Sequence, residues 1–396
     1  MLSIMHISTR LILGGSQENT VLSAEGQADL GHRVCIVYGP IYGPEGSLLD
    51  RVKRHGGVEA IETPRLVRQV APWTDLRCLR DLRQLIRRWK PDVVHTHSSK
   101  AGVLGRLAAW KENVPCVVHT IHGLAFHPYQ SRLANAVYIA SERVAARRCH
   151  RIIGVADAMR DQALAAGVGR PDQYVTVYSG METKAFLESS PCRGDVRTEL
   201  GFDDEDFVLG TVSRLAELKG HDDLLGALGP LMRTRPGLKL LWIGDGWWRD
   251  RLLRRVADLG LAERVVHTGL VEPGAIPRLL SACDAVAHPS YREGLPRVVP
   301  QALLSGVPVV VYDVDGAPEA CANGQTGRLI EPGDLNALRE SVLWMMDHPQ
   351  ERAAMGERGR DVCRERFDAS AMVEKLETVY ASVLKRPAAG NGADGG

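Results

Sequence analysis

The sequence predicts an α/β protein made of two doubly wound domains, each a parallel sheet with helices on both faces. Three observations lead to this fold class. The 396 residues are too many for one ordinary hydrophobic core, and a chain of this length has about two or three domains. Short β-rich runs alternate with amphipathic stretches of helical period. This alternation restarts near residue 207, after a polar segment around 188–195 that is the best linker candidate.

Each predicted strand or helix is a short run of residues in which apolar side chains recur with the period of that element. In the first half, the expected strands are Ile4–Ser8, Arg33–Tyr38, Asp92–His95, Cys116–Thr120, Arg151–Val155 and Val175–Tyr178. In the second half, they are Phe207–Val212, Lys239–Ile243, Arg264–Thr268, Ala285–His288, Val307–Val311 and Thr326–Ile330. The clearest helical stretches are Glu18–Leu30, Ser131–Arg148, Asp222–Thr234, Arg249–Leu259 and Asp334–Met346. Such strands and helices form βαβ units, and the ligand site is then expected at the carboxyl ends of the strands.

The domain boundaries follow from this alternation. We expect one domain over 1–190 and a second over 191–366. We also expect a C-terminal helix over 367–386 that packs back on the first domain. The low-complexity residues 387–396 predict a disordered tail.

Composition excludes several classes of protein. The chain is 44% hydrophobic with a mean hydropathy of -0.13, which is typical of a soluble globular protein. No stretch approaches the roughly 20 apolar residues of a membrane span. The eight cysteines lie 33 or more residues apart without a CxxC pair, which argues against structural zinc and fits a reducing cytoplasm. A net charge of +1 argues against a nucleic-acid partner.

The charge is unevenly distributed. Residues 1–190 carry a net +7 and residues 191–396 a net -6, and residues 51–90 alone carry +7. At the centre of this basic window lies a predicted helix over 74–92, in which Leu76, Leu79, Leu82 and Ile86 recur at helical spacing. Two interpretations stay open for it. It is either a surface helix with a solvated face or a helix that binds an anionic lipid or a pyrophosphate group.

Polar motifs follow the strands of the first half. Gly14 and Gly15 come between the first strand and a helix, where glycine lets the backbone approach an anion at the helix N-terminus, although a plain tight turn is the alternative. The GxGxxG pattern of dinucleotide-binding sites is not present. Two histidine pairs, His95 with His97 and His119 with His122, end later strands. No carboxylate lies beside either pair in the sequence, so we expect no metal site.

The second half carries the stronger cluster. Arg214 and Lys219, at a strand end that enters a helix, predict a diphosphate clamp because arginine offers forked donors and lysine a point charge. Glu293 precedes a helix that contains Gln301 eight residues later. The Asp313–Asp315 segment has the DxD pattern of a manganese site, but its position after a strand favours an ordinary turn.

These motifs resemble those of the family 4 glycosyltransferases, which have the GT-B fold. The resemblance extends over residues 2–385. It rests on Gly14-Gly15, His122-Gly123, VSRLAELKG (212–220), IGDGWWRDRL (243–252), HPSYREGLPRVVPQALLSGVPVVV (288–311) and GAPE followed by NGQTGRLIEPGD (316–334). The segments HSSKAGVLGRLA (97–108) and HTIHGLAFH (119–127) resemble the subgroup that builds capsular polysaccharides and exopolysaccharides.

The resemblance implies two Rossmann-like domains that face each other across a cleft, the first binding the acceptor and the second the nucleotide sugar. It implies a retaining transfer, without metal or other cofactor, of a hexosyl or N-acetylhexosaminyl group. The donor would be a nucleotide-diphosphate sugar, a UDP-sugar in the first place. The acceptor would be a glycan or a polyprenyl-diphosphate-linked sugar in cell-surface polysaccharide biosynthesis. We then expect a cytoplasmic enzyme that the helix of Arg77–Lys90 holds against the inner face of the plasma membrane.

The family's functional positions carry over residue by residue. The implied catalytic residues are His122 and Glu293. The implied donor-binding residues are Gly14, Gly15, Arg214, Lys219, Gly294, Leu295, Gln301 and Glu319. The weaker assignments to the acceptor are His97 and Lys100.

One position departs from the family pattern. Gln301 stands where the family has a second glutamate, whose carboxylate accepts hydrogen bonds from the nucleotide ribose. The amide keeps one acceptor oxygen but no charge, so donor binding would weaken by about 1–2 kcal/mol. This departure keeps open a non-catalytic partner protein of the same fold. A nucleotide-sugar 2-epimerase is the other alternative.

Overall fold

The computed structural model describes residues 1–43 and 45–384, and these residues form two compact units. Unit 1 contains Met1–Gly180 and the chain from Ser370 onward, and unit 2 contains Met181–Ala369. The expected boundary at 190/191 therefore lies ten residues too late. The Met181 N–H donates to the Phe367 carbonyl (2.8 Å), which ties the segment after Gly180 to unit 2. The expected tail over 387–396 and residues 385–386 lie outside the described residues.

Unit 1 is built on a seven-stranded sheet in the order β3-β2-β1-β4-β5-β6-β7, and every neighbouring pair is parallel. Its strands are β1 (Ser3–Ser8), β2 (Arg33–Tyr38), β3 (Val58–Glu62), β4 (Val93–His97), β5 (Cys116–Ile121), β6 (Arg151–Gly154) and β7 (Tyr174–Thr176). The sequence did not predict β3. As an edge strand it is largely accessible, and its VEAIE sequence lacks the apolar run that marks the central strands.

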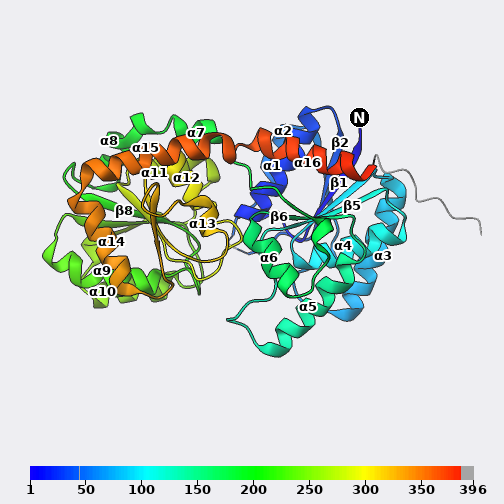
Figure 1. The fold of residues 1–396 in the computed structure, drawn as a ribbon, viewed down its shortest axis with the longest axis horizontal. Coiled ribbons are helices and arrows are strands. Elements are labelled where there is room, and N and C mark those ends of the chain that lie inside the picture. Colours follow the sequence, from blue (N-terminus) through cyan, green and yellow to red (C-terminus); the bar gives the residue numbers. More distant parts are fainter. Residues whose placement is uncertain (44, 385–396) are drawn as a thin grey trace, which may run out of the picture. The chain divides into compact units, whose positions relative to one another are not determined.

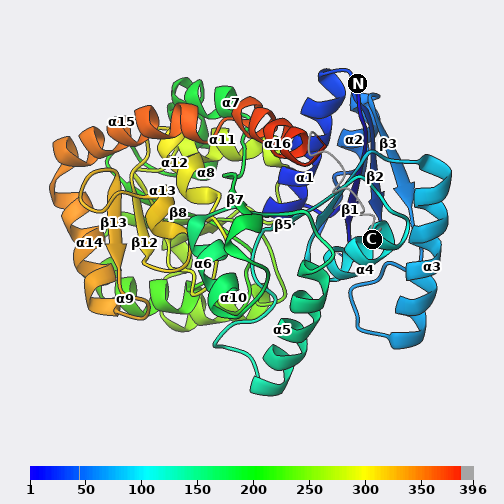
Figure 2. The same cartoon turned by 45° about the vertical axis from the view of Figure 1, so that its right-hand side comes forward.

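Helices cover both faces of this sheet. They are α1 (Gly15–Asp29), α2 (Leu49–His55), α3 (Pro72–Trp89), α4 (Ser99–Lys111), α5 (Arg132–Ala146), α6 (Asp157–Ala165) and α16 (Ala369–Leu384), with a short 3-10 helix η1 (Pro171–Gln173). The helices α1 and α16 lie side by side in both views (Figures 1 and 2). The hydrophobic core on the other face packs α3 and α4 against β1, β2, β4 and β5.

The C-terminal helix α16 is part of unit 1 through buried contacts with α1. Tyr380 is fully buried and accepts a hydrogen bond from Gln27 Nε2 (3.1 Å). Asn19 Nδ2 lies 3.0 Å from the sulfur of Met372, which is also buried on α16. A helix that follows all of unit 2 in the sequence thus completes the apolar cover of the first sheet.

Unit 2 repeats the architecture with six parallel strands in the order β10-β9-β8-β11-β12-β13. The strands are β8 (Phe207–Val212), β9 (Leu238–Ile243), β10 (Val265–His267), β11 (Ala285–His288), β12 (Val309–Tyr312) and β13 (Gly327–Ile330). The helices are α7 (Thr183–Leu187), α8 (Arg193–Leu200), α9 (His221–Thr234), α10 (Arg249–Asp258), α11 (Ile276–Ser281), α12 (Val298–Leu304), α13 (Ala317–Ala320), α14 (Leu335–Asp347) and α15 (Pro349–Arg366), with 3-10 helices η2 (Ser190–Cys192), η3 (Ala262–Arg264) and η4 (Pro273–Ala275).

The basic helix α3 is rotated relative to the expected apolar stripe. Its buried residues are Cys78, Leu82, Ile86 and Trp89, whereas Leu76 is 49% exposed. The buried set recurs every three or four residues and faces the sheet, which turns Leu76 toward solvent. Among the described residues, no helix is both long and apolar enough to cross a membrane.

The packing of α16 predicts a large stability difference between two leucine-to-alanine variants of unit 1. Leu376 on α16 is 2% exposed and Leu133 on α5 is 78% exposed. We expect Leu376→Ala to lower the free energy of unfolding by about 2–5 kcal/mol, because it removes buried methyl groups and leaves a cavity. Leu133→Ala should cost at most about 0.5 kcal/mol. Urea unfolding of both variants measures this, and equal losses would contradict the assignment of α16 to the core.

Candidate active site

The strand order of unit 2 brings its polar motifs to one edge of the sheet. The order reverses between β8 and β11, which are direct neighbours although β9 and β10 separate them in the sequence. In such sheets, ligands bind outside the carboxyl ends of the strands at this reversal. The loop after β8 carries Arg214 and Lys219, and the loop after β11 carries Glu293. The candidate donor residues therefore converge where the fold class places a ligand.

The two loops are in direct contact. The Tyr291 N–H donates to the Leu218 carbonyl (2.8 Å). A Cβ built on Gly220, whose φ is +71°, would lie 2.0 Å from the Pro289 carbonyl oxygen. Only glycine fits such a left-handed position with so close an approach of two backbones. This contact fixes the distance between the loop of Lys219 and that of Glu293.

Glu293 is the electrostatic centre of the site. Its Oε1 accepts hydrogen bonds from Lys219 Nζ (2.6 Å) and His288 Nε2 (2.9 Å). Burial alone would raise the pKa of Glu293, but the charge of Lys219 and the contact with His288 outweigh it and hold the pKa well below its usual range. The contacts with Lys219 and His288 therefore favour the ionised form of the carboxylate.

A third loop, which follows β12, makes hydrogen bonds with the backbone of the loop that contains Glu293. The Glu293 N–H donates to Asp315 Oδ2 (2.7 Å), and the Gly316 N–H donates to the Gly294 carbonyl (3.0 Å). Asp315, with a φ of 49°, therefore holds the loop after β11 through its side chain. This is the local turn role expected for the DxD segment, and it makes Asp315 a support for the site.

Arg214 lies against an aromatic side chain. Its guanidinium carbon is 5.5 Å from the ring centroid of Trp247, whose Nε1–H donates to Glu217 (2.8 Å). Trp247 is 59% exposed at the start of α10. A cation within about 6 Å of an aromatic ring centroid is attracted by the ring. This contact places the Arg214 side chain beside Trp247 in the loop after β8.

The remaining donor candidates lie close by in the sequence but differ in exposure. Leu295 is 6% exposed in the loop after β11, and Gln301 is 5% exposed on α12. Glu319 lies in the first turn of the short helix α13, after β12. All three belong to the elements that follow β11 and β12, at the same edge as Glu293.

In unit 1, Gly14 and Gly15 form the start of α1, which follows β1 after a short loop. Gly14 is the N-cap residue and supplies no side chain to cap the helix, and Gly15 is its first residue. The first backbone N–H groups of a helix have no intrahelical acceptor, so this end can bind an anion. Strand order reverses between β1 and β4 in this sheet, which puts the helix start at the reversal.

His122 follows β5 and belongs to a chain of histidines. Its Nε2 lies 3.0 Å from His97 Nδ1, and His97 Nε2 lies 2.9 Å from His6 Nδ1. His97 is part of β4 and only 1% exposed, whereas the sequence predicted a loop position. Both of its ring nitrogens contact other histidines. Its nitrogens are thus engaged within unit 1, and acceptor binding by His97 stays a prediction.

Lys100, the second expected acceptor residue, ties two helices together. Its Nζ lies 2.5 Å from Asp75 Oδ1 on α3 and donates to the Gln69 carbonyl. The side chain is 13% exposed. Its contacts hold α4 to the basic helix, and acceptor binding by Lys100 stays a prediction.

Three site residues were missed from the sequence. His6 lies opposite His95 in the β1–β4 register, which the usual strand order of doubly wound sheets could have indicated. His288 ends β11 five residues before Glu293, inside a motif that was noted only for its glutamate. The Tyr380 hydroxyl lies 2.7 Å from His95 Nδ1 although Tyr380 is near the other end of the chain, and no local sequence pattern indicates that contact.

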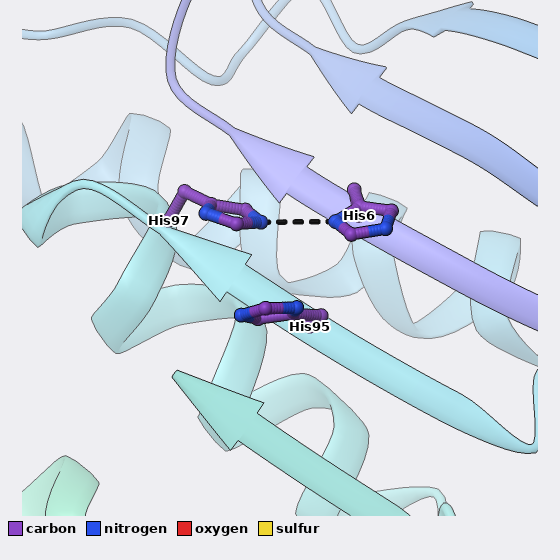
Figure 3. Close-up of side chains that lie close together, drawn as sticks. All are labelled: His6, His95 and His97. Atoms are coloured by element: carbon purple, nitrogen blue, oxygen red, sulfur yellow. Dashed lines mark hydrogen bonds between the residues drawn. The ribbon is translucent and has the colours of Figure 1, made fainter. Parts of the chain in front are cut away.

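Among the described residues, the three buried histidines of β1 and β4 form a group whose nitrogens lie close enough together to hold a metal ion. One nitrogen from each of His6, His95 and His97 lies within 4.8 Å of the others. Figure 3 shows His95 and His97 on the same strand, with His6 beside them on β1. Their ring centroids are 4.3 Å apart for His95 and His97 and 5.2 Å apart for His6 and His97.

Comparison with known proteins identifies the family. Residues 193–362 match the family model described as Glycosyl transferases group 1, and residues 14–180 match the one described as Glycosyl transferase 4-like domain. The chain belongs to the family 4 glycosyltransferases and is a glycosyltransferase with the GT-B fold.

Individual relatives agree with this. An Escherichia coli protein named UDP-Gal:alpha-D-GlcNAc-diphosphoundecaprenol alpha-1,3-galactosyltransferase is 28% identical over 83% of this chain and 84% of its own length. The capsular polysaccharide biosynthesis glycosyltransferase CapM of Staphylococcus aureus is 24% identical over 80% and 84%. The crystal structure of HepE from Anabaena with UDP and glucose superposes with a TM-score of 0.83 at 23% identity, covering 96% of this chain and 100% of that chain.

Because of the buried histidines of unit 1, we expect the free energy of unfolding to decrease as the pH is lowered from neutral into mild acid. Burial lowers the pKa of His6 to about 4 and holds the pKa of His95, His97 and His119 well below 6.5. The unfolded chain takes up protons near pH 6.5 that the folded chain does not. Their contribution is therefore complete above that pH and is lost as pH falls toward 4.

Each such histidine adds up to about 1.4 kcal/mol per pH unit to the slope. Urea midpoints at pH 7, 6 and 5 measure it, and His6→Gln should make the slope shallower. A midpoint that stays constant from pH 7 to pH 5 would show that these side chains become protonated without cost.

Proposed function

We propose that the enzyme transfers a hexosyl group from a UDP-sugar, with retention of anomeric configuration and without a metal, to a polyprenyl-diphosphate-linked acceptor in cell-surface polysaccharide assembly. The single observation that carries the donor half is the contact of Lys219 with Glu293 at the strand reversal of unit 2. It puts a cation for phosphate and a fixed anion for a sugar within 2.6 Å of each other. HepE, whose crystal contains UDP and glucose, shares the fold and supports a UDP-sugar.

In this proposal, each charge of unit 2 has a part in the transfer. Arg214 and Lys219 bind the donor diphosphate and stabilise the negative charge that grows on it as the sugar departs. The Glu293 carboxylate faces the sugar, where it stabilises positive charge on the ring. Two cations that neutralise the leaving group supply the charge that Mg²⁺ or Mn²⁺ would otherwise provide, which supports transfer without metal.

The residues of unit 1 act on the sugar and acceptor side. His122 orients the reacting centre, and the helix start at Gly14 and Gly15 offers backbone N–H groups to a phosphate. The Escherichia coli relative is named for an acceptor on diphosphoundecaprenol, and CapM is named for capsular polysaccharide, which supports a lipid-linked acceptor here.

The surface of α3 supports peripheral binding to an anionic membrane. Trp73 is 81% and Leu76 49% exposed, and the exposed Arg77 and Arg80 follow within two turns. Arg83, in contrast, is held by Glu112 Oε1 (2.5 Å). Exposed aromatic and aliphatic side chains beside arginines are typical of helices that lie in a membrane interface.

Thermal unfolding with nucleotides tests the donor half. Of UDP, GDP, ADP and CMP at millimolar concentration, we expect UDP to raise the melting temperature most. A ligand at 100 times its dissociation constant adds about 2.7 kcal/mol to the folded state. Arg214→Ala should abolish the shift, whereas Arg254→Ala, which changes an exposed arginine of the same unit, should retain it. If UDP raised the melting temperature of the Arg214→Ala variant by the same amount, Arg214 would not bind the nucleotide.

Replacing Gln301 by glutamate tests whether this position contacts the ribose. A carboxylate accepts stronger hydrogen bonds from hydroxyl groups than an amide does, so Gln301→Glu should tighten UDP binding by about five- to thirtyfold. Titration calorimetry measures the dissociation constant. An unchanged or weaker affinity, in a variant that still unfolds cooperatively, would mean that Gln301 does not contact the nucleotide.

Co-sedimentation with liposomes tests the membrane proposal. We expect binding to anionic vesicles at low salt and release at high salt. Arg77→Gln and Arg80→Gln should each weaken binding by about fivefold, since each well-placed arginine contributes about 1 kcal/mol. Arg83→Gln, which removes an arginine already paired with Glu112, is the matched control. If the protein did not bind anionic vesicles at low salt, the surface of α3 would not be a membrane-binding surface.

A further inference from the structure

The face of the first sheet beneath α1 and α16 carries a continuous chain of buried polar side chains. His6 and His95 are fully buried, and His97 is 1% exposed. His6 Nε2 lies 2.8 Å from Gln27 Oε1 on α1, and the chain continues through His97 to His122. Buried polar groups of this kind rigidify a structure only when all of them are satisfied.

The direction of every hydrogen bond in this chain follows from Gln27. Burial lowers the pKa of His6 and His97, so both rings are neutral and each has one donor and one acceptor nitrogen. Gln27 Oε1 can only accept, so His6 Nε2 carries the proton and His6 Nδ1 accepts from His97 Nε2. His97 Nδ1 is then an acceptor, and the proton between it and His122 belongs to His122 Nε2.

A second branch starts from the other end of the Gln27 amide. Gln27 Nε2 donates to the Tyr380 hydroxyl (3.1 Å), which can donate in turn to His95 Nδ1 (2.7 Å). His95 Nε2 then donates to Thr120 Oγ1 (2.6 Å). The two branches are compatible because the oxygen of the Gln27 amide accepts in one and its nitrogen donates in the other. Tyr380 on the C-terminal helix is thus linked to His122 through the three side chains of Gln27, His6 and His97.

The hydrogen bonds account for the same histidines without a metal. All six ring nitrogens of His6, His95 and His97 have hydrogen-bond partners. His6 Nδ1 and His97 Nε2 lie 2.9 Å from each other, which is a hydrogen-bond distance (Figure 3).

We propose that His97 is a positioning residue for His122: its Nδ1 accepts the His122 Nε2 proton and so keeps a proton on Nε2 of that ring. This contact selects the Nε2–H tautomer of His122 over the Nδ1–H tautomer. Gln27 and Tyr380 set the direction of the chain and so determine which tautomer it is. This proposal rests on the proposed role of His122 in the transfer.

Two amide variants of His97 separate positioning from structure. The amide of asparagine reaches the place of Nδ1, so His97→Asn keeps an acceptor for His122. The longer glutamine reaches the place of Nε2, so His97→Gln keeps a partner for His6 and loses the one for His122. We expect kcat to fall about tenfold or more in His97→Gln and by at most about threefold in His97→Asn. KM for the donor should stay within about twofold in both, and equal losses of kcat would overturn the proposal.

A spectroscopic readout does not depend on activity. In protein labelled with ¹⁵N-histidine, we expect His122 in the Nε2–H tautomer in the wild type, with the Nδ1–H form appearing in His97→Gln. Tyr380→Phe keeps the shape of the core but frees the Gln27 amide to turn, so it should also yield a mixture of tautomers. A wild-type His122 protonated on Nδ1, or a spectrum unchanged in both variants, would refute the proposal.

The His122→Ala variant separates the catalytic role of His122 from the positioning of its ring by His97. Full activity in this variant, together with the expected ¹⁵N shifts, would refute the proposed catalytic role of His122 and leave the positioning of its ring intact. Elemental analysis of the purified enzyme completes the test. Stoichiometric zinc that His6→Gln abolishes would overturn the hydrogen-bonded chain.

Discussion

The pairing of strands out of chain order is the constraint on which the candidate site depends. β8 pairs with β11 in unit 2, and β1 pairs with β4 in unit 1, each time across the point where the strand order reverses. Helices on both faces stabilise these central strands, while the loops at their carboxyl ends are left free to carry polar side chains. The pairing brings Lys219 within 2.6 Å of Glu293, although 74 residues separate them.

The charges of the two units work differently because their surroundings differ. In unit 2, Lys219 and Glu293 form an ion pair at the carboxyl ends of the strands. In unit 1, burial lowers the pKa of His6, His95 and His97, and their rings are linked through donor and acceptor nitrogens. We propose that the first arrangement serves a diphosphate and that the second positions the ring of His122.

The sequence predicted what local periodicity and strand ends determine. Alternating strands and helices indicated two parallel sheets, and Lys219 and Glu293 became site candidates because they lie in loops that follow strands. The edge strand Val58–Glu62 was not predicted because much of it faces water. Of the apolar stripe expected for α3, Leu82 and Ile86 are buried but Leu76 is exposed, because the sheet on which α3 packs decides which side is covered. The contact of Tyr380 with His95 joins residues 285 positions apart, and no local pattern encodes it.

The central proposal for this enzyme is that it transfers a sugar and does not only bind one. The direct measurement is release of free nucleotide from a UDP-sugar, in EDTA, with and without a synthetic polyprenyl-diphosphate-linked sugar. The account predicts release only when the acceptor is present, together with a product that keeps the donor's anomeric configuration. Release without acceptor, or no release with any nucleotide sugar while UDP still binds, would contradict it.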